Sequence, residues 1–204
     1  MRIVKPSTEI ISASFRIEKT IEYAGRLCYK SEDKTTEDSY KAFIARLMES
    51  KHESVLEHGS ISVHFVCDRG VSHELVRHRI ASFSQESTRY CNYGKDKFDK
   101  EITVVAPGFL EEYSLSYEYW RHACEKAENA YFCLLECGAS PQEARSVLPN
   151  SLKTELVVTA NPREWLHIFQ LRTAKEAHLQ MREIMIPLKE GFAEIWPSIF
   201  GANQ

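Results

Sequence analysis

The most polar segment of the chain is the thirteen-residue run 77–89, which contains three arginines, one histidine and four hydroxyl side chains. Arginine presents a planar fork of donors that fits phosphate and pyrimidine carbonyl oxygens, and hydroxyl and backbone N–H groups can complete the shell around an oxyanion. The run therefore indicates an anion-binding site. On composition alone, a Ser-rich loop beside a solvated surface pair of Glu74 and Arg77 remains an open alternative.

Glu74, Arg77 and His78 have the i, i+3, i+4 spacing of one helix face. A helix over about 71–78 would place them opposite a core face that includes Leu75. In that arrangement the carboxylate of Glu74 would orient the guanidinium of Arg77.

A second cluster, His52-Glu53-Ser54-Val55-Leu56-Glu57-His58, contains two histidines with two carboxylates between them. These are metal-ligand types, but their spacing lacks the i, i+4 histidine pair of zinc hydrolases. The spacing favours a helical turn capped by Ser54 and Glu57 over a metal site.

A third cluster begins with Asn161 and Arg163 at an expected helix start, continues with His167 on the same face, and ends with Arg172. A helix N-terminus attracts anions through its dipole and its unpaired N–H groups, so a phosphate or a cofactor carbonyl group could bind here. The alternative is that Asn161 is only a cap and His167 only a surface residue.

The elements that must position these clusters follow from hydrophobic periodicity and from capping residues. Apolar residues at helical spacing predict helices over 17–27, 40–48, 71–78, 109–137, 140–149, 161–172 and 175–196. Strands are expected over 2–13, 60–68, 102–105 and 156–159, with an irregular stretch over 82–100. Because helices outnumber strands and do not alternate with them, the fold class is α+β, with helices packed on a mostly antiparallel sheet.

Several residues mark where these helices begin, end or bend. Ser140-Pro141-Gln142-Glu143 is a capping box with proline at the first helical position, and Asn161 before Pro162 repeats that start signal. Gly138 is suited to a left-handed C-cap, and Pro187 should kink the last helix.

Composition narrows the class of protein. The chain has 204 residues and a formal net charge of −3, with no linker or repeat, so we expect a single domain over 1–204. The acidic balance argues against a dedicated nucleic-acid binder. The six cysteines show no C-x-x-C pair, no apolar run is long enough to span a membrane, and the first residues lack the pattern of a signal peptide. We therefore expect a cytoplasmic protein with reduced thiols and no membrane partner.

The three clusters together resemble the flavin-dependent thymidylate synthases, whose signature is Arg-His-Arg, seven residues, then Ser. The chain has Arg77-His78-Arg79, the seven residues 80–86, then Ser87. Flanking matches are the run 52–58, Arg145 before Val147-Leu148-Pro149, Asn161 with Arg163, and Leu171-Arg172. The similarity extends over about residues 15–190.

The resemblance implies a thymidylate synthase-complementing-like fold and reductive methylation of dUMP to dTMP. In this reaction 5,10-methylenetetrahydrofolate gives the carbon, NADPH gives the hydride, and FAD carries the hydride between them. It also implies a homotetramer with active sites shared between subunits, no nucleic-acid partner and no metal.

The resemblance also assigns roles to individual residues. Arg172 would be the catalytic residue, drawing charge onto the pyrimidine at N3. Residues expected to contact FAD are Ser54, Arg77, His78, Arg79, Gln85, Asn161, Arg163 and His167. Residues expected to hold dUMP are Glu74, Arg77, Gln85, Glu86, Ser87, Arg89, Arg145 and Arg172.

Three positions depart from the family pattern. Ser84 stands where Asn is frequent, Gln85 where Glu is frequent, and His167 where a flavin-contacting Asn is frequent. Either Gln85 keeps the role of the usual Glu as a neutral hydrogen-bonding group, or Glu86 replaces it.

The chemistry of the residues agrees with the resemblance. Methylation of uracil at C5 needs electron density there, and a cationic Arg172 beside N3 would stabilise the developing anion. No cysteine has an evident base or helix N-terminus beside it, and Ser87 has no apparent base, so we assign Ser87 to binding.

Two other classes of function remain as alternatives. One is a non-catalytic nucleotide or RNA-binding module that uses Arg77, Arg79 and Arg89 on phosphates and would show steep salt dependence. The other is a metal-dependent hydrolase, whose ligands would be His52, His58, His64 and His73.

Overall fold

The computed structural model describes residues 1–201, and its internal contacts divide the chain into two compact units. Unit 1 comprises Met1–Ser7, Phe65–Arg77 and Ser84–Leu156. Unit 2 comprises Thr8–His64, His78–Phe83 and the chain from Val157 on. The boundary passes between Arg77 and His78, in the middle of the Arg-His-Arg motif. A single domain over 1–204 stays a prediction.

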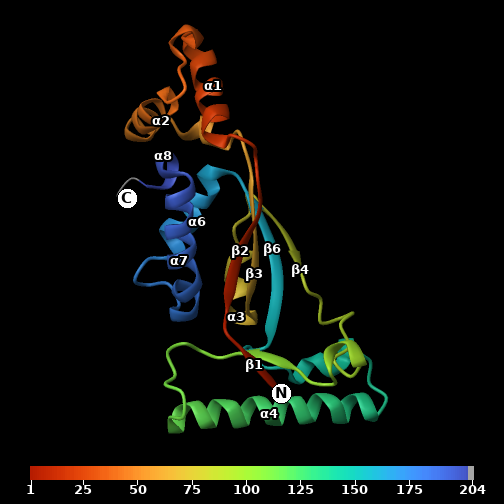
Figure 1. Cartoon of the computed structure of the whole chain (residues 1–204). Helices are drawn as coiled ribbons and strands as arrows, with labels where there is room; N and C mark the ends of the chain where they lie inside the picture. The colour runs from red at the N-terminus through yellow and green to blue at the C-terminus, as the bar shows by residue number, and fades with distance from the viewer. Residues whose placement is uncertain (202–204) are drawn as a thin grey trace. The chain divides into compact units, whose positions relative to one another are not determined.

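The main sheet has four strands in the order β2 (Ser7–Ala13), β3 (Ile61–Asp68), β6 (Lys153–Ala160) and β4 (Ala81–Gln85). The strand arrows and their connections can be followed in Figure 1. The N–H of Ser14, after the end of β2, donates to the carbonyl of Ser60, before the start of β3. The N–H of Arg69, after β3, likewise donates to the carbonyl of Asn150, before β6. End-to-start pairing of this kind is antiparallel, as expected.

Unit 1 is built on a long helix and a two-stranded parallel pair. The pair is β1 (Arg2–Val4) with β5 (Thr103–Val105), and Figure 1 shows the long helix α4 (Leu115–Glu136) running beside it. The buried side chains of Ile102, Val104 and Tyr131 form the centre of this core. The remaining helical segments of the unit are α3 (Arg69–Leu75), η3 (Asp96–Phe98), α5 (Pro141–Ala144) and η4 (Arg145–Val147).

Unit 2 is mostly helical and has an aromatic core. Its helical segments are α1 (Ile17–Tyr29), η1 (Glu32–Lys34), α2 (Ser39–Glu49), η2 (Glu53–Glu57), α6 (Pro162–Arg172), α7 (Leu179–Ile195) and α8 (Pro197–Phe200). Trp165, Phe169 and Phe192 pack with ring centroids 5.1–5.7 Å apart. The indole N–H of Trp165 donates to the carbonyl of Ile61 at 3.0 Å, which ties α6 to the first residue of β3.

The capping residues behave as the sequence predicts. Ser140 and Glu143 form the reciprocal capping box, and Gly138 adopts a left-handed φ of 91° after α4. The side chain of Asn161 accepts the N–H of Glu164 at 2.8 Å and begins α6. Side-chain oxygens satisfy N–H groups that the helix leaves unpaired, which is why these ends could be placed from sequence.

The predicted helix over 71–78 is wrong at both ends. Asp68 accepts the N–H of Val71 at 2.8 Å, so α3 begins at Arg69, and the helix ends at Leu75. Arg77 and His78 lie beyond it, and His78 is buried in unit 2. The shared helix face of Glu74, Arg77 and His78 is therefore not formed, because burial of the imidazole requires the chain to leave the helix.

Five other elements differ from the prediction. Strand β4 covers residues 81–85, of which 82–85 were expected to be irregular. The first strand is divided after Val4, close to Pro6, which has no N–H to donate. The long helix begins at 115 instead of 109 because Ser114 caps it, accepting the N–H of Tyr117 at 3.2 Å. The segment expected as a helix over 140–149 is α5 followed by η4, and the last long helix starts at 179.

Within residues 1–201, none of the helices is both long and apolar enough to span a bilayer.

Candidate functional site

Some of the predicted site residues lie in two clusters, one within each unit. The imidazole cluster of unit 2 consists of His78, Glu164, His167 and Arg172. The arginine cluster of unit 1 consists of Arg89, Arg145, Thr88 and Gln142. Each cluster is described within its own unit.

His78 is the centre of the imidazole cluster. The Nε–H of Arg172 donates to Nε2 of His78 at 3.0 Å. On the other side of the ring, Nδ1 lies 3.4 Å from Oε1 of Glu164. His167, four residues after Arg163 on α6, meets the ring edge-on with centroids 5.8 Å apart. The structure thus brings His78 of the Arg-His-Arg motif together with His167 and Arg172 of the third cluster.

The imidazole of His78 is neutral at physiological pH. Burial lowers its pKa to about 4, and the charges of Arg172 and His167 act in the same direction. Burial also raises the pKa of the Glu164 carboxyl group. The contact between His78 and Glu164 therefore joins a neutral ring and a carboxyl group and is not an ion pair.

This shift predicts an acid-dependent loss of stability. Histidine has an ordinary pKa of 6.5, and that of buried His78 is about 4. Between these two pH values, His78 is protonated in the unfolded chain and neutral in the folded one. The free energy of unfolding should fall over this window by about 3 kcal/mol at most from this group. His78→Gln should flatten the slope, measured by urea unfolding at several pH values.

Glu164 acts in the opposite direction, because its raised pKa favours proton binding by the folded state above pH 4.5. The comparison should therefore rest on the difference between the two proteins in the interval from pH 6.5 to 5, since Glu164 is present in both. Equal slopes for the wild type and His78→Gln in this interval would contradict the assignment.

The start of α6 and the segment η2 form an acidic-basic contact. Arg163 donates to Oε1 of Glu57 at 2.6 Å and lies 3.4 Å from Oε2 of Glu53. No side chain caps η2, so the expectation that Ser54 and Glu57 cap this turn is wrong. The carboxylate of Glu57 binds Arg163 instead, a pairing between segments 106 residues apart that local spacing does not reveal.

The other predicted flavin-contacting residues of unit 2 lie at its surface or at helix ends. Arg79 is exposed, and Ser54 lines a separate cavity of about 230 Å³ with His52 and Tyr29. Asn161 uses its oxygen for the helix cap, and its amide nitrogen takes no part in that cap. Cationic and amide donors of this kind are the groups that a phosphate-bearing flavin nucleotide requires, so the residues present fit FAD.

In unit 1, two arginines are held by neutral side chains. Nε of Arg89 donates to Oε1 of Gln142 at 3.1 Å, and Nη1 of Arg145 donates to Oγ1 of Thr88 at 3.2 Å. Arg145, Thr88 and Gln142 line an open cavity of about 520 Å³ together with Arg69 and His73. The positive charges of Arg69 and Arg145 in the lining of this cavity suit an anionic ligand such as a phosphate group.

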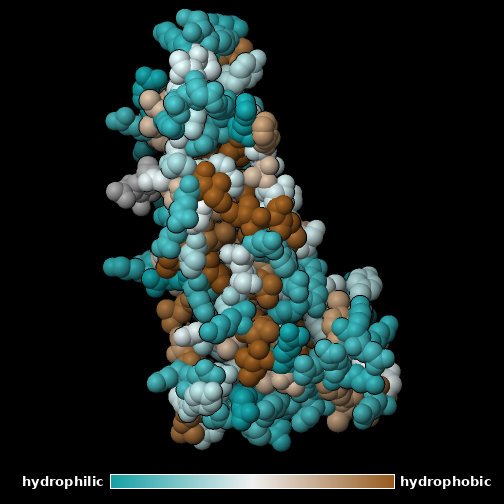
Figure 2. All heavy atoms as spheres, in the orientation of Figure 1, coloured by the Kyte–Doolittle hydropathy of each residue, from teal (hydrophilic) through white to brown (hydrophobic). Residues whose placement is uncertain are grey.

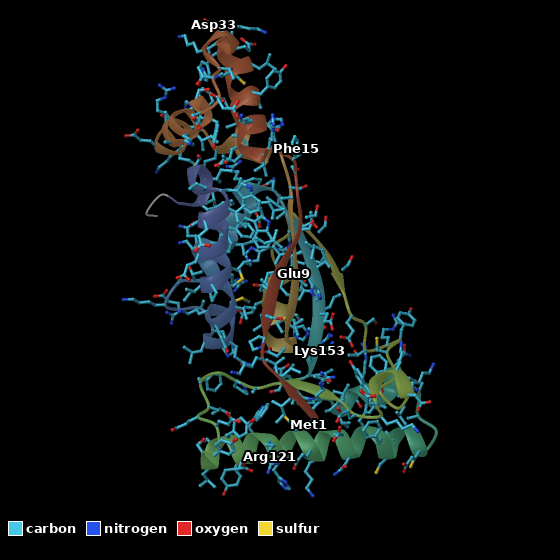
Figure 3. The ribbon with its side chains drawn as sticks, in the orientation of Figure 1. Met1, Glu9, Phe15, Asp33, Arg121 and Lys153 are labelled. Atoms are coloured by element: carbon cyan, nitrogen blue, oxygen red, sulfur yellow. The ribbon has the colours of Figure 1, made fainter. Side chains whose placement is uncertain are left out.

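Gln85 and Glu86 point to different partners within unit 1. Nε2 of Gln85 donates to Oγ of Ser72 at 3.0 Å and to Oγ1 of Thr154 at 3.1 Å. Glu86 accepts the hydroxyl proton of Tyr93 at 3.1 Å, and Nζ of Lys153 lies 3.1 Å from its other oxygen, outside hydrogen-bond geometry. Figure 3 labels Lys153 at the start of β6. Gln85 thus acts as a donor in a neutral network, whereas Glu86 faces a cation.

The remaining substrate-binding candidates also lie in unit 1. Glu74 and Ser87 are half-buried, and Arg77 is exposed as the last residue before the boundary with unit 2. The hydroxyl of Ser87 accepts the N–H of Arg89 at 3.3 Å, a local turn contact.

Sequence reasoning did not single out Thr88, Gln142 and Glu164, which the structure places in the two clusters. Gln142 follows the capping serine Ser140, and Glu164 follows the capping Asn161, so both read as ordinary first-turn residues. Gln142 and its partner Arg89 are 53 residues apart, and Glu164 and its partner His78 are 86 residues apart. No local pattern in the sequence therefore indicates these contacts.

The bond from Arg89 to Gln142 predicts a specific effect on binding in unit 1. Gln142→Leu should free the guanidinium of Arg89 and weaken nucleotide phosphate binding about 10-fold, since one hydrogen bond to a charged group is worth roughly 1.5 kcal/mol. Isothermal titration with dUMP measures this effect. As the control, Gln170→Leu on α6 of unit 2 removes an exposed glutamine elsewhere and should leave the affinity unchanged.

The four histidines proposed as hydrolase ligands are not gathered into a metal site in the part of the chain that the structure describes. Over residues 1–201, no group of three or more His, Cys, Asp or Glu side chains is arranged to hold a metal ion. Nδ1 of His52 lies 3.4 Å from the hydroxyl of Tyr29, and His73 lines the unit 1 cavity.

The architecture is a mixed α+β fold that a solved nucleotide methylase shares. It matches the crystal structure of a UMP/dUMP methylase from Streptomyces cacaoi bound with 5-Br dUMP, with a TM-score of 0.82, 24% identity, and coverage of 98% of this chain and 96% of that one. The family model described as thymidylate synthase complementing protein matches residues 9–198.

Curated relatives agree with the family model. A flavin-dependent thymidylate synthase from Geobacter sulfurreducens is 34% identical over 190 residues, covering 90% of this chain and 80% of that protein. One from Pyrococcus abyssi is 32% identical over 192 residues, covering 91% of this chain and 78% of that protein. The chain therefore belongs to the flavin-dependent thymidylate synthase family, which confirms the resemblance and the predicted α+β fold class.

Proposed function

We propose that this protein is the methyltransferase that converts dUMP to dTMP with FAD as cofactor, 5,10-methylenetetrahydrofolate as carbon donor and NADPH as reductant. The contact between Arg172 and His78 of the Arg-His-Arg motif is the structural observation that supports it most. Family membership over residues 9–198 supports the same reaction.

In this proposal the residues that contact FAD are Ser54, Arg77, His78, Arg79, Gln85, Asn161, Arg163 and His167. FAD supplies hydride transfer between the reductant and the one-carbon unit. The chain's part is to hold the cofactor through charged and amide donors.

For dUMP, the proposal assigns Glu74, Arg77, Gln85, Glu86, Ser87, Arg89, Arg145 and Arg172. Arg89 and Arg145 would bind the phosphate group, because their guanidinium groups are already oriented by Gln142 and Thr88. Glu86 or Gln85 would meet polar atoms of the nucleotide.

Arg172 is the proposed catalytic residue. C5 of the pyrimidine can attack the one-carbon unit only if the ring first carries anionic charge, and a guanidinium beside N3 lowers the energy of that anionic form. Because the imidazole of His78 is neutral, it does not repel the guanidinium of Arg172, and its Nε2 accepts the hydrogen bond that Arg172 donates. No cysteine nucleophile is needed, and burial raises the pKa of the Cys67 thiol to about 12, which keeps it protonated.

The proposal includes a cytoplasmic homotetramer with active sites shared between subunits and no nucleic-acid or membrane partner. Large apolar side chains at the surface support an assembly: Phe15, labelled between β2 and α1 in Figure 3, is 83% exposed, and Ile80 is 71% exposed. Figure 2 shows further hydrophobic residues at the surface in this view. Surfaces of this kind are commonly covered by a partner subunit.

The test is the absorbance of protein-bound FAD during anaerobic addition of NADPH, with and without dUMP, followed by addition of methylenetetrahydrofolate and assay of dTMP. Bleaching that responds to dUMP, then reoxidation with dTMP formed, is the expected result. Protein that binds no flavin, or a flavin indifferent to dUMP, would overturn the proposal and favour a nucleotide-binding module.

A further inference from the structure

We propose that Glu164 is a positioning residue for Arg172 and acts through His78: its carboxylate holds the ring with the proton on Nδ1, so that Nε2 presents its lone pair to Arg172. The expected effect on catalysis rests on the proposed function, whereas the effect of Glu164 on the tautomer of His78 does not.

The direction of the first hydrogen bond follows from the chemistry of arginine. A guanidinium has N–H donors and no acceptor, so Nε2 of His78, 3.0 Å from Nε of Arg172, must carry the lone pair. A neutral imidazole has one proton, which is then on Nδ1. The atom that Nδ1 faces is Oε1 of Glu164 at 3.4 Å.

Burial makes this arrangement matter. His78 is 6% exposed and Glu164 is 7% exposed, so water has little access to replace either partner. Without an acceptor beside Nδ1, the tautomer with the proton on Nε2 loses one of its two disadvantages, and only the opposition of two donors, Nε2–H and the N–H of Arg172, still disfavours it. The carboxylate of Glu164 therefore adds to the stability of the tautomer that Arg172 requires.

The local fold explains why Glu164 is available for this contact. It occupies the third position of α6, and its backbone N–H is satisfied by the side chain of Asn161. In a capping box the side chain at this position would return to the cap residue, but Asn161 and Glu164 form only half of that exchange. Glu164 lies in the first turn of α6, and Arg172 is its last residue, roughly 12 Å further along the helix axis. His78 contacts both residues.

The consequence for Arg172 is geometric. A hydrogen bond at Nε restrains the plane of the guanidinium, whose Nη1 and Nη2 groups form the fork that would meet the pyrimidine. A residue that restrains this plane should act on kcat, since orientation matters most when charge develops on the substrate. It should have little effect on the affinity for dUMP, which the phosphate contacts of unit 1 would dominate.

The experiment combines a spectroscopic and a kinetic measurement on Glu164→Leu and Glu164→Gln. Nitrogen-15 NMR of the histidine rings, in protein without ligands, should show the Nδ1–H tautomer of His78 in the wild type and a shift toward Nε2–H in Glu164→Leu. In the same variant kcat for dTMP formation should fall about 10–100-fold with KM for dUMP within about threefold. Glu164→Gln should restore most of both, because its amide oxygen can accept from Nδ1–H.

The matched control is Glu22→Leu, which removes another buried carboxylate of unit 2, paired with Arg26 at 2.8 Å. It should lower stability without changing the tautomer of His78 or kcat per folded enzyme. If Glu164→Leu does not fold, Glu164→Ala replaces it with the same readouts. An unchanged tautomer in a folded variant, or an unchanged kcat, would overturn the proposal. If Glu164→Leu shifts the tautomer of His78 but the wild-type protein makes no dTMP, the proposed function is overturned and the effect of Glu164 on His78 stands.

Discussion

Arg172→Ala is expected to reduce kcat about 100–1,000-fold, the usual effect of removing one group that stabilises transition-state charge. FAD should remain bound, because the other proposed flavin contacts of unit 2 are untouched. The variant removes the only group whose proposed role is to stabilise charge on the pyrimidine. It also removes the N–H group that donates a hydrogen bond to Nε2 of His78.

Flavin absorbance after gel filtration measures FAD retention, and single-turnover dTMP formation measures the chemical step. Arg172→Lys should lie between the wild type and the alanine variant, since lysine keeps the charge but not the planar fork. Arg46→Ala removes an exposed arginine of unit 2 on α2 and should leave both measurements unchanged. Loss of FAD together with activity in Arg172→Ala would show that its role is assigned wrongly.

Arg77→Ala should weaken the binding of both dUMP and FAD, each by about 10–100-fold, because a hydrogen bond to a charged group contributes roughly 1.5–3 kcal/mol. Arg77 is exposed, and it is joined by one peptide bond to the buried His78. A neighbour anchored in this way restricts where the guanidinium can reach, although the side chain itself stays accessible to ligands.

Titration of dUMP into the protein, and of FAD into protein freed of flavin, gives the two dissociation constants. Arg121→Ala is the control in unit 1, since this exposed arginine of α4 pairs only with its helix neighbours Glu118 and Glu125 among the described contacts. It should change neither constant. Unchanged affinities in Arg77→Ala would refute the double assignment, and loss of one ligand alone would leave Arg77 with that ligand's site.

Much of the secondary structure could be predicted because its signals are local. Ser140, Gly138 and Asn161 mark helix ends by hydrogen bonds or backbone angles within a few residues, and the alternation over β3 reports one buried face. Strand β4 could not be found in this way. Its residues, Ala-Ser-Phe-Ser-Gln, alternate over only four positions and include a single large apolar side chain, and the strand forms at the edge of the sheet beside β6.

The sequence by itself determined the family, through the ordered spacing of Arg77-His78-Arg79, Ser87 and Arg172, and it determined the α+β class and the main helix caps. Only the tertiary structure decided that His78 leaves the helix after α3 and is buried between Glu164 and Arg172. The physical reason is that a tautomer and a hydrogen-bond direction depend on which groups surround a ring in space. Those groups come from segments more than eighty positions away along the chain, where no periodicity connects them.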